Sequence, residues 1–221
     1  MPDPISPAAS PAPPAPDRPT ALILAGGLGR RMAPTARAAP PKPLVTLAGR
    51  PLIAHVIDAI APQAGEIWIN ANADLETYAG FGRPLVPDTI PGHPGPLAGV
   101  LAGLERLAEA GSGGCLLTVP ADTPFLPADL VARLMERHRD TGGLVCAGSG
   151  GQRHPVVALW PGTVRAALRQ SLASGQLKVG LFLEALQAVT VVWDSEPDDP
   201  FFNVNTPEDL AVAEIRRTAR L

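Results

Sequence analysis

The sequence LAGGLGRRM at residues 24–32 directly follows an apolar run, residues 20–24, that is typical of a buried β-strand. Glycines at the end of a strand allow a sharp turn and bring backbone N–H groups close to a ligand. Arg30, Arg31 and the later Lys42 supply the positive charge and the hydrogen-bond donors that phosphate oxygens need. The pattern predicts a nucleoside triphosphate site at the end of the first strand.

Two better-known glycine motifs do not fit this stretch. The dinucleotide-binding fingerprint needs G-x-G-x-x-G, whereas Met32 stands where the third glycine must let helix and strand pack. The P-loop, in which Gly-Lys-Ser/Thr follows a first glycine and four residues, does not occur in the sequence. The predicted phosphate site is therefore of a different type.

Length and composition limit the class of protein. With 221 residues, 46% of them hydrophobic, the chain can bury one sizeable core. A net charge of −3 and scattered basic residues leave no electrostatic footprint for nucleic acid. No apolar run reaches the roughly 18 residues of a membrane helix. Cys115 and Cys146 lie far apart and outside any metal-ligand spacing, so we expect two buried thiols in a reducing compartment.

Residues 1–19 differ in composition from the rest of the chain. The segment MPDPISPAASPAPPAPDRP is dominated by proline, alanine and serine, and Ile5 is its only long aliphatic residue. Such a segment cannot form a core, so we expect a disordered, partly polyproline tail. It has neither the basic nor the apolar region of a secretory signal. We therefore expect a tail, 1–19, a single domain, 20–221, and a cytoplasmic protein.

From residue 20 onward, short apolar runs alternate with stretches of helical spacing. The runs typical of strands are 21–24, 66–70, 84–86, 115–119, 144–147, 156–160 and 189–193. Helical spacing is found in 52–60, 97–107 and 130–138, and the last helix has a start signal in Thr206, Pro207, Glu208 and Asp209. This alternation predicts βαβ units, that is, an α/β fold with a mostly parallel sheet covered by helices.

Polar residues follow the carboxyl ends of several predicted strands, where such sheets bind ligands. They are Gly26 and Gly27 after the first strand, Asn70 and Asn72 after the second, Asp88 after the third and Asp122 after the fourth. Asn70 and Asn72 either contact a base edge through paired donor and acceptor groups or are solvated turn residues. Asp88 is either a turn residue or a contact to the base, the sugar or a metal.

Asp122 is the main candidate for a metal ligand. It lies in the segment PADTPF, residues 120–125, after the most apolar strand. A carboxylate that faces a triphosphate can hold a divalent cation, which neutralises charge developing on the phosphate. The alternative is that Asp122 caps the next helix. That helix begins near Asp129, so Asp129 is the better candidate for the cap. We therefore expect Asp122 to bind the metal.

The histidines are weaker candidates. His55 and His138 lie in helical patterns and are expected to pack, while His93, in a loop rich in glycine and proline, is open to either role. Arg153 and His154 begin a strand after a glycine-rich segment and are candidates for contact with an acceptor substrate. No Ser/His/Asp or Cys/His set has a plausible shared site, so covalent catalysis has no support in the sequence.

Several motifs occur together in the order seen in one enzyme family. They are LAGG at 24–27 with Arg31-Met32, NAN at 70–72, PGPLAG at 94–99, PADTP at 120–124, HP at 154–155 and NVNTPEDL at 203–210. Together they resemble the molybdenum cofactor guanylyltransferases from about residue 20 to residue 217. Each motif is loose on its own, but the ordered set is specific.

The resemblance implies a Rossmann-like three-layer sandwich of the nucleotidyltransferase type. It implies transfer of GMP from GTP to molybdenum-molybdopterin, giving molybdopterin guanine dinucleotide and pyrophosphate. The residues that it implies for GTP binding are Leu24, Ala25, Gly26, Lys42, Asn70, Asp88 and Asp122, the last also binding Mg²⁺. Molybdenum-insertion and molybdoenzyme maturation proteins are the implied protein partners.

This reaction would need positioning and charge neutralisation rather than a general base, because the acceptor is already an anionic phosphate. The glycines at 26–29, Gly27 included, would cradle the triphosphate. Arg31 and Lys42 would stabilise the α-phosphate and the leaving pyrophosphate, with Asp122 holding the metal. The candidates for binding the acceptor are Arg153, His154, Lys178, Asn203 and Asn205.

One segment departs from the family pattern. The family usually has a glycine after Arg-Met and an Asp-Lys pair a few residues later, whereas here Met32 is followed by APTARAAPP, residues 33–41. The lysine arrives in PKPL, residues 41–44, a version that resembles the sugar-phosphate nucleotidyltransferases. The phosphate contact is therefore made by either Lys42 or Arg37.

Two rival functions stay open. A cytidylyl or sugar-phosphate nucleotidyltransferase of the same fold would differ in its substrates, and the sequence has no obvious sugar-specific segment. A non-catalytic carrier of GTP or pterin would not need the charges of Arg31, Lys42 and Asp122, which favour an enzyme. LAGG at the first strand resembles the guanylyl branch, because the cytidylyl branch usually reads Ala-Ala-Gly.

Overall fold

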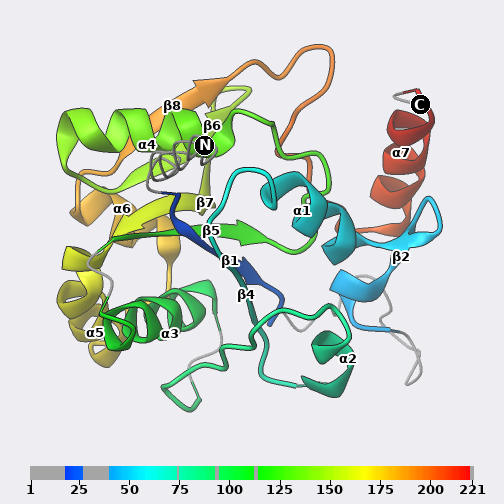
Figure 1. The fold of residues 1–221 in the computed structure, drawn as a ribbon. Coiled ribbons are helices and arrows are strands. Elements are labelled where there is room, and N and C mark those ends of the chain that lie inside the picture. The colour runs from blue at the N-terminus through cyan, green and yellow to red at the C-terminus, as the bar shows by residue number, and fades with distance from the viewer. Residues whose placement is uncertain (1–17, 27–39, 74, 93–94, 112–113, 220–221) are drawn as a thin grey trace, which may run out of the picture.

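The computed structural model describes residues 18–26, 40–73, 75–92, 95–111 and 114–219, and a six-stranded sheet lies at their centre (Figure 1). The strand order is β4-β1-β5-β7-β6-β8. The strands, in chain order, are β1 (Thr20–Leu24), β4 (Ile67–Asn70), β5 (Cys115–Pro120), β6 (Val145–Ser149), β7 (Gln152–Pro161) and β8 (Val189–Trp193). In this sheet only β7 runs antiparallel to its neighbours, so the sheet is mostly parallel, as predicted.

The carboxyl ends of the parallel strands meet at one edge of the sheet. Leu24, the last residue of β1, pairs with Asn70 at the end of β4 and with Pro120 at the end of β5. Because β7 is reversed, its first residue, Gln152, pairs with Ser149 at the end of β6. Parallel sheets bind ligands at this edge. The topology therefore brings Asn70, at the end of β4, and the segment that follows β5, with Asp122, to the same side of the molecule as the end of β1.

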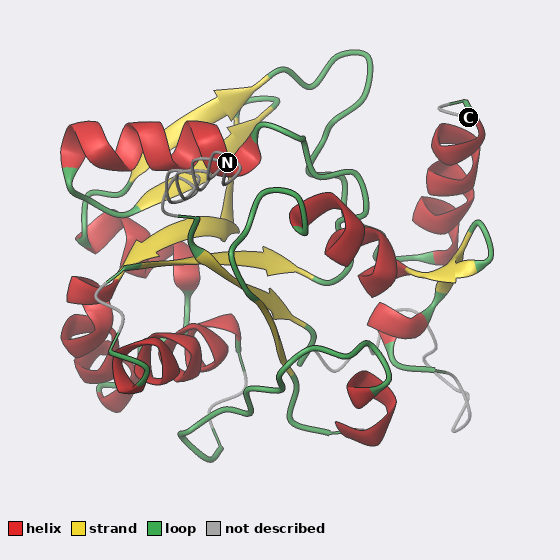
Figure 2. Ribbon diagram, viewed as in Figure 1, coloured by secondary structure: helices red, strands yellow, loops and turns green. Residues whose placement is uncertain are grey.

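Helices cover both faces of the sheet (Figures 1 and 2). The core on one face receives side chains from α1, α2 and α4, and the core on the other face receives them from α3, α5 and α6. The helices are α1 (Leu52–Ile60), α2 (Leu75–Ala79), α3 (Pro96–Glu109), α4 (Leu130–Thr141), α5 (Arg165–Ala173), α6 (Val179–Ala185) and α7 (Pro207–Thr218), with the 3₁₀ turns η1 (Lys42–Leu44) and η2 (Gly162–Val164). This three-layer arrangement confirms the predicted fold class.

A third, smaller apolar cluster joins segments that are distant in the sequence. Its buried members are Leu47, Leu52, Phe125, Val204 and Ala213. Leu47 belongs to the short hairpin of β2 (Thr46–Leu47) and β3 (Arg50–Pro51), which packs against α7 at one end of the molecule (Figure 1). The cluster thereby fixes the chain near residues 42, 122 and 205 relative to one another.

The observed elements differ from the predicted ones in a few places. Residues 84–86 do not form a strand, because only Leu85 makes a parallel bridge, to Ile69. Pro84 and Pro87 have no N–H to donate, so the ladder cannot extend in either direction. The sequence pattern also does not predict α2, α5, α6 or the β2–β3 hairpin, which are short and have few apolar residues in a clear period.

The amino-terminal segment enters the domain at Pro19. Pro19 is buried, and its carbonyl accepts a hydrogen bond from Gly65 N at 3.1 Å. Residues 1–17, most of the predicted tail, lie outside the described residues. Within the described ranges, no helix has the length and apolar character needed to cross a membrane.

Candidate active site

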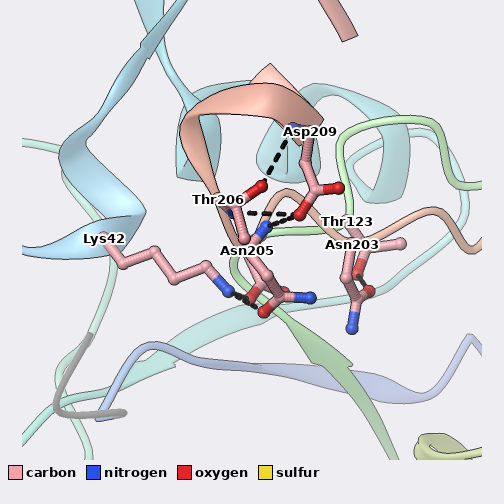
Figure 3. Close-up of polar contacts among 7 residues, drawn as sticks. Lys42, Thr123, Asn203, Asn205, Thr206 and Asp209 are labelled. Atoms are coloured by element: carbon pink, nitrogen blue, oxygen red, sulfur yellow. Dashed lines mark hydrogen bonds and ion pairs between the residues drawn. The ribbon is translucent and has the colours of Figure 1, made fainter. Parts of the chain in front are cut away.

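Three side chains from distant parts of the chain meet at the carboxyl edge of the sheet. The ammonium group of Lys42 donates to the carboxylate of Asp122 and also, at a distance of 2.5 Å, to Oδ1 of Asn205. Figure 3 shows the Lys42 side chain extending toward Asn205. The side chains of Lys42 and Asp122 are 14% and 17% exposed, so the ion pair is shielded but still within reach of a ligand. The structure thus places the predicted catalytic lysine beside the predicted metal ligand.

Local structure fixes the backbone that carries Lys42. Pro41 and Pro43 restrict φ on both sides of the lysine, and Pro43 is buried. The turn closes with Leu44 N donating to Pro41 O at 2.8 Å. Since the backbone is already constrained, placing the ammonium group costs mainly side-chain torsional freedom.

Asp122 lies just beyond β5, in a segment tied to the loop before α7. Its backbone carbonyl accepts from Val204 N at 3.0 Å, and the neighbouring Thr123 Oγ1 donates to Asn203 Oδ1 at 2.6 Å (Figure 3). Asp122 Oδ2 contacts Lys42, whereas Oδ1 is buried without a hydrogen-bond partner among the described residues. Leaving a buried carboxylate oxygen unpaired costs free energy, so this atom is a favourable place for an incoming cation or donor.

The donor set at Asp122 suits Mg²⁺ better than a metal held by protein alone. Within the described parts of the chain, no group of three or more His, Cys, Asp or Glu side chains could hold a metal ion. Mg²⁺ is usually bound by one or two carboxylates together with substrate phosphates. A single carboxylate with one unpaired buried oxygen matches that pattern, and Asp122 supplies it.

Asn70, Asn72 and Asp88 form one hydrogen-bonded group beside β1. Asn70 Nδ2 donates to Val86 O and to Asp88 Oδ1, and Asn72 Nδ2 donates to Asp88 Oδ2, each at 2.8 Å. Asp88 N donates in return to Asn72 Oδ1 at 2.8 Å. Asn70 is only 4% exposed, so the alternative of a solvated turn residue is wrong for it. The group fixes the orientation of the Asp88 carboxylate.

Two glycines make room for this group. A Cβ on Gly99 of α3 would lie 2.4 Å from Asn70 Oδ1, and a Cβ on Gly26 would lie 3.3 Å from Asn72 Nδ2. Real Cβ atoms do not approach as closely as the first of these distances. Gly99 therefore allows α3 to pack directly against Asn70.

The end of β1 presents backbone groups at the same place. Leu24 O accepts from Ala121 N at 3.1 Å, and Ala25 N donates to the backbone carbonyl of Asn70 at 2.9 Å. The carbonyls of Ala25 and Gly26 accept no hydrogen bond from any described residue. Carbonyl oxygens at the end of a strand can accept from donors on a ligand.

His154 belongs to a second polar group at this edge of the sheet. Ser149 Oγ accepts from His154 Nε2 and donates to Asp199 Oδ1, both at 2.7 Å, and the His154 ring lies 4.8 Å from that of Phe201. Burial lowers the pKa of His154 below its ordinary 6.5, and the charge of Asp199 opposes part of this effect. The imidazole is therefore neutral near pH 7.

Arg216 of α7 anchors the loop that contains Asp199. Its Nη2 donates to Asp199 O at 2.8 Å, and its Nε lies 3.0 Å from Asp198 Oδ1. The guanidinium also lies over the rings of Phe125 and Phe202, at 4.5 and 5.1 Å. These contacts hold the loop from 198 to 205 against α7 and Phe125. The bond from Ser149 to Asp199 holds it against the end of β6.

The predicted acceptor residues do not all come together. His154, Asn203 and Asn205 lie in or against the 198–205 loop, as described above. Arg153 and Lys178 are exposed and make no side-chain hydrogen bond or ion pair with any described residue. The predicted site residues Gly27 and Arg31 lie outside the described residues, as do Arg37 and His93.

The two histidines and two cysteines that the sequence predicts to have no catalytic role are held in packing contacts. His55 Nε2 and His138 Nδ1 lie 2.8 and 2.7 Å from backbone carbonyl oxygens, which agrees with packing roles. Cys146 is buried and Cys115 partly so, and burial raises the pKa of both thiols. Neither cysteine is therefore suited to act as a nucleophile.

Some residues of the site have little or no sequence signal. Ser149, Asp199 and Arg216 are polar residues of ordinary type whose partners lie 5 to 50 positions away, so spacing cannot join them. Gly99 is the exception, because a glycine inside a helical pattern costs about 1 kcal/mol relative to alanine and so signals a close approach.

Solved structures share this fold. Molybdopterin-guanine dinucleotide biosynthesis protein A from Archaeoglobus fulgidus is 22% identical with a TM-score of 0.71, the match covering 90% of this chain and 99% of that one. CMP:2-keto-3-deoxy-manno-octonic acid synthetase complexed with CTP is 14% identical with a TM-score of 0.66, covering 91% and 98%. At these identities the likeness concerns the fold alone.

The family of the MobA-like NTP transferase domain matches residues 21–194, which span the sheet from β1 to β8, so the chain is a nucleotidyltransferase. Molybdenum cofactor guanylyltransferases from Rhodopseudomonas palustris (strain BisB5) and Bradyrhizobium sp. (strain ORS 278) are 46% and 48% identical to it. These matches cover 88% and 87% of this chain and 91% and 90% of the relatives. The chain therefore belongs to the MobA-like NTP transferase family and, within it, to the molybdenum cofactor guanylyltransferases.

Proposed function

We propose that this protein transfers GMP from GTP to molybdenum-molybdopterin, forming molybdopterin guanine dinucleotide and releasing pyrophosphate. The observation that supports it most is the Lys42–Asp122 pair at the carboxyl edge of the sheet, where Asp122 Oδ1 has no partner among the described residues. The relatives are named molybdenum cofactor guanylyltransferases, and this name indicates a guanine nucleotide and the molybdenum cofactor as the substrates. Molybdenum-insertion and molybdoenzyme maturation proteins are the proposed protein partners.

The reaction is a displacement at the α-phosphorus of GTP. An oxygen of the acceptor phosphate forms the new P–O bond, the bond to the bridging oxygen of the β-phosphate breaks, and pyrophosphate leaves with the electron pair. The attacking oxygen is already anionic, so no side chain has to remove a proton. Catalysis then depends on positioning and on neutralising the charge that develops on the phosphates.

Lys42 places a positive charge beside the reacting phosphates, and its backbone is constrained by the flanking prolines. Its ammonium group can donate to oxygens of the α-phosphate and of the leaving pyrophosphate. Arg31 and the glycine turn, Gly27 included, are proposed to hold the triphosphate with it. Mg²⁺ bound by Asp122 would supply a further positive charge at the phosphates and is the proposed metal ion.

Guanine is proposed to bind beside the end of β1. Its N1–H and N2–H₂ groups are adjacent donors. The site offers the carbonyls of Ala25 and Gly26, which have no partner among the described residues, and the carboxylate of Asp88, which Asn70 and Asn72 hold in place. Leu24 and Asn70 set the positions of these acceptors through their backbone and side-chain bonds. A group of acceptors of this kind favours a base with two adjacent donors.

The acceptor is proposed to bind on the β6–β7 side of the same edge. His154, Asn203 and Asn205 lie around the 198–205 loop. His154 and Asn203 offer polar groups to the pterin, while the side chain of Asn205 contacts Lys42 beside them. Arg153 and Lys178 are exposed cations that suit its terminal phosphate.

A pyrophosphate-release assay tests this function. We expect release only when GTP, Mg²⁺ and molybdenum-loaded molybdopterin are all present with the protein, and loss of release when any one is omitted. A matched reaction with a sugar phosphate as acceptor checks the rival transferase function. Release that requires the sugar phosphate, or no release with the pterin, would contradict the proposal.

A further inference from the structure

Lys42 has two partners of different character in this site. One is the charged Asp122, which in the proposed function, on which this inference rests, also binds the metal. The other is the neutral carboxamide of Asn205, whose Oδ1 accepts from the ammonium group at 2.5 Å. We infer that Asn205 is a positioning residue that holds the Lys42 ammonium in place when the carboxylate of Asp122 turns to the metal.

The backbone of Asn205 is fixed independently of Lys42. Asn205 N and Thr206 N both donate to Asp209 Oδ2 at 2.9 Å, and Asp209 N donates to Thr206 Oγ1 at 3.2 Å. These contacts form a capping box at the first turn of α7 (Figure 3). The helix start therefore acts as a rigid support for the Asn205 side chain.

The chemistry of the two partners explains why the site has both. A carboxylate is a strong ligand for Mg²⁺, so the metal and Lys42 compete for Asp122. A neutral amide oxygen competes much less for the metal, and it keeps its hydrogen bond to the ammonium group. Because a lysine side chain has large rotamer freedom, one fixed acceptor reduces the number of positions that the released ammonium can adopt.

Chemical labelling tests the inference without any substrate. The chain has only two lysines, Lys42 and the exposed Lys178, so acetylation by acetic anhydride can be followed at both by peptide mass spectrometry. Acetylation requires the lysine nitrogen to reach the reagent, and a nitrogen held by Asn205 is less able to do so. The Lys178 rate corrects for reagent and conditions.

We expect Asn205→Ala to raise the Lys42 to Lys178 labelling ratio about fivefold, the effect of one hydrogen bond of about 1 kcal/mol. The rise should be larger in an Asp122→Asn background, which removes the competing charge. Asn205→Asp keeps the acceptor oxygen and should restore the protected ratio. Asn203→Ala changes the same loop without touching Lys42 and should leave the ratio as in the wild-type protein. An unchanged ratio in Asn205→Ala, with melting temperatures equal, overturns the inference.

A double-mutant cycle distinguishes positioning from direct contact with the acceptor. If Asn205 acts through Lys42, Asn205→Ala lowers kcat in the wild-type protein and has little further effect on a Lys42→Ala variant. Equal losses in both backgrounds mean that Asn205 contacts the acceptor itself and overturn the inference. Where turnover of Lys42→Ala is too slow to measure, the labelling result decides. Absence of GMP transfer by the wild-type protein contradicts the proposed function but leaves the labelling result standing.

Discussion

At the scale of single residues, the site is defined by atoms that lack or share partners. Asp122 offers one oxygen to Lys42 and leaves the other buried and unpaired among the described residues. Asp88 is the opposite case, since both of its oxygens accept from asparagine side chains. The unpaired oxygen suits a metal that arrives with the substrate, whereas the braced carboxylate suits recognition of a base.

We expect Asp122→Asn to reduce turnover on the order of a hundredfold or more, because it keeps the shape and an acceptor for Lys42 but removes the charge that binds the metal. Initial rates over a range of Mg²⁺ concentrations measure this. Asp140→Asn, an exposed acid on α4 that pairs with Arg137, is the matched control and should keep wild-type rates. Near-normal turnover of Asp122→Asn at saturating Mg²⁺ contradicts the metal assignment.

The buried imidazole of His154 predicts a dependence of stability on pH. Because burial lowers its pKa in the folded protein, the unfolded chain binds the proton more readily once the pH falls below about 6.5. The contribution of neutral His154 to stability is therefore present above this pH and decreases as the pH falls toward the folded pKa.

His154→Gln keeps a donor for Ser149 but cannot take up a proton. Urea unfolding at pH 7.5 and pH 5 should show a smaller loss of unfolding free energy in this variant than in the wild-type protein. An equal or greater loss in the variant would show that His154 does not titrate in this way.

At the scale of elements, the start of α7 links folding to the site. The sequence predicts this start from Thr206, Pro207, Glu208 and Asp209, and the structure confirms the cap at Thr206. The same pattern does not reveal that Asp209 also fixes Asn205, because that contact depends on how the preceding loop enters the helix. Local capping signals are thus readable, but their consequence for a residue outside the helix is not.

We expect Thr206→Ala to destabilise the protein by about 1 kcal/mol, since it removes the acceptor for Asp209 N. In a protein of this size that change lowers the melting temperature by about 2–4 °C. Thr206→Ser retains the hydroxyl that accepts from Asp209 N, so its melting temperature should equal that of the wild-type protein. Equal melting of the alanine and serine variants would show that the cap contributes nothing to stability.

At the scale of the whole molecule, the sequence predicts the parallel strands and the edge at which ligands bind. Strand ends are readable because buried strands are continuous apolar runs, so Asn70 and Asp122 can be assigned to one edge without a structure. The pairing of Lys42 with Asn205 is not readable, since it depends on a third apolar cluster joining segments more than 150 residues apart. Long-range packing, rather than local pattern, completes the site.

Guanylyl transfer to the pterin is tested most directly by a competition between nucleotides. The protein is incubated with equal concentrations of GTP and CTP, Mg²⁺ and molybdenum-molybdopterin, and the dinucleotide products are identified by mass. Cytosine would place an acceptor against the acceptor groups at the end of β1, and each buried mismatch costs about 1–3 kcal/mol. We therefore expect the guanine dinucleotide to exceed the cytosine dinucleotide by roughly a hundredfold or more. Comparable amounts of the two products would contradict guanylyl transfer while leaving the nucleotidyltransferase family unchanged.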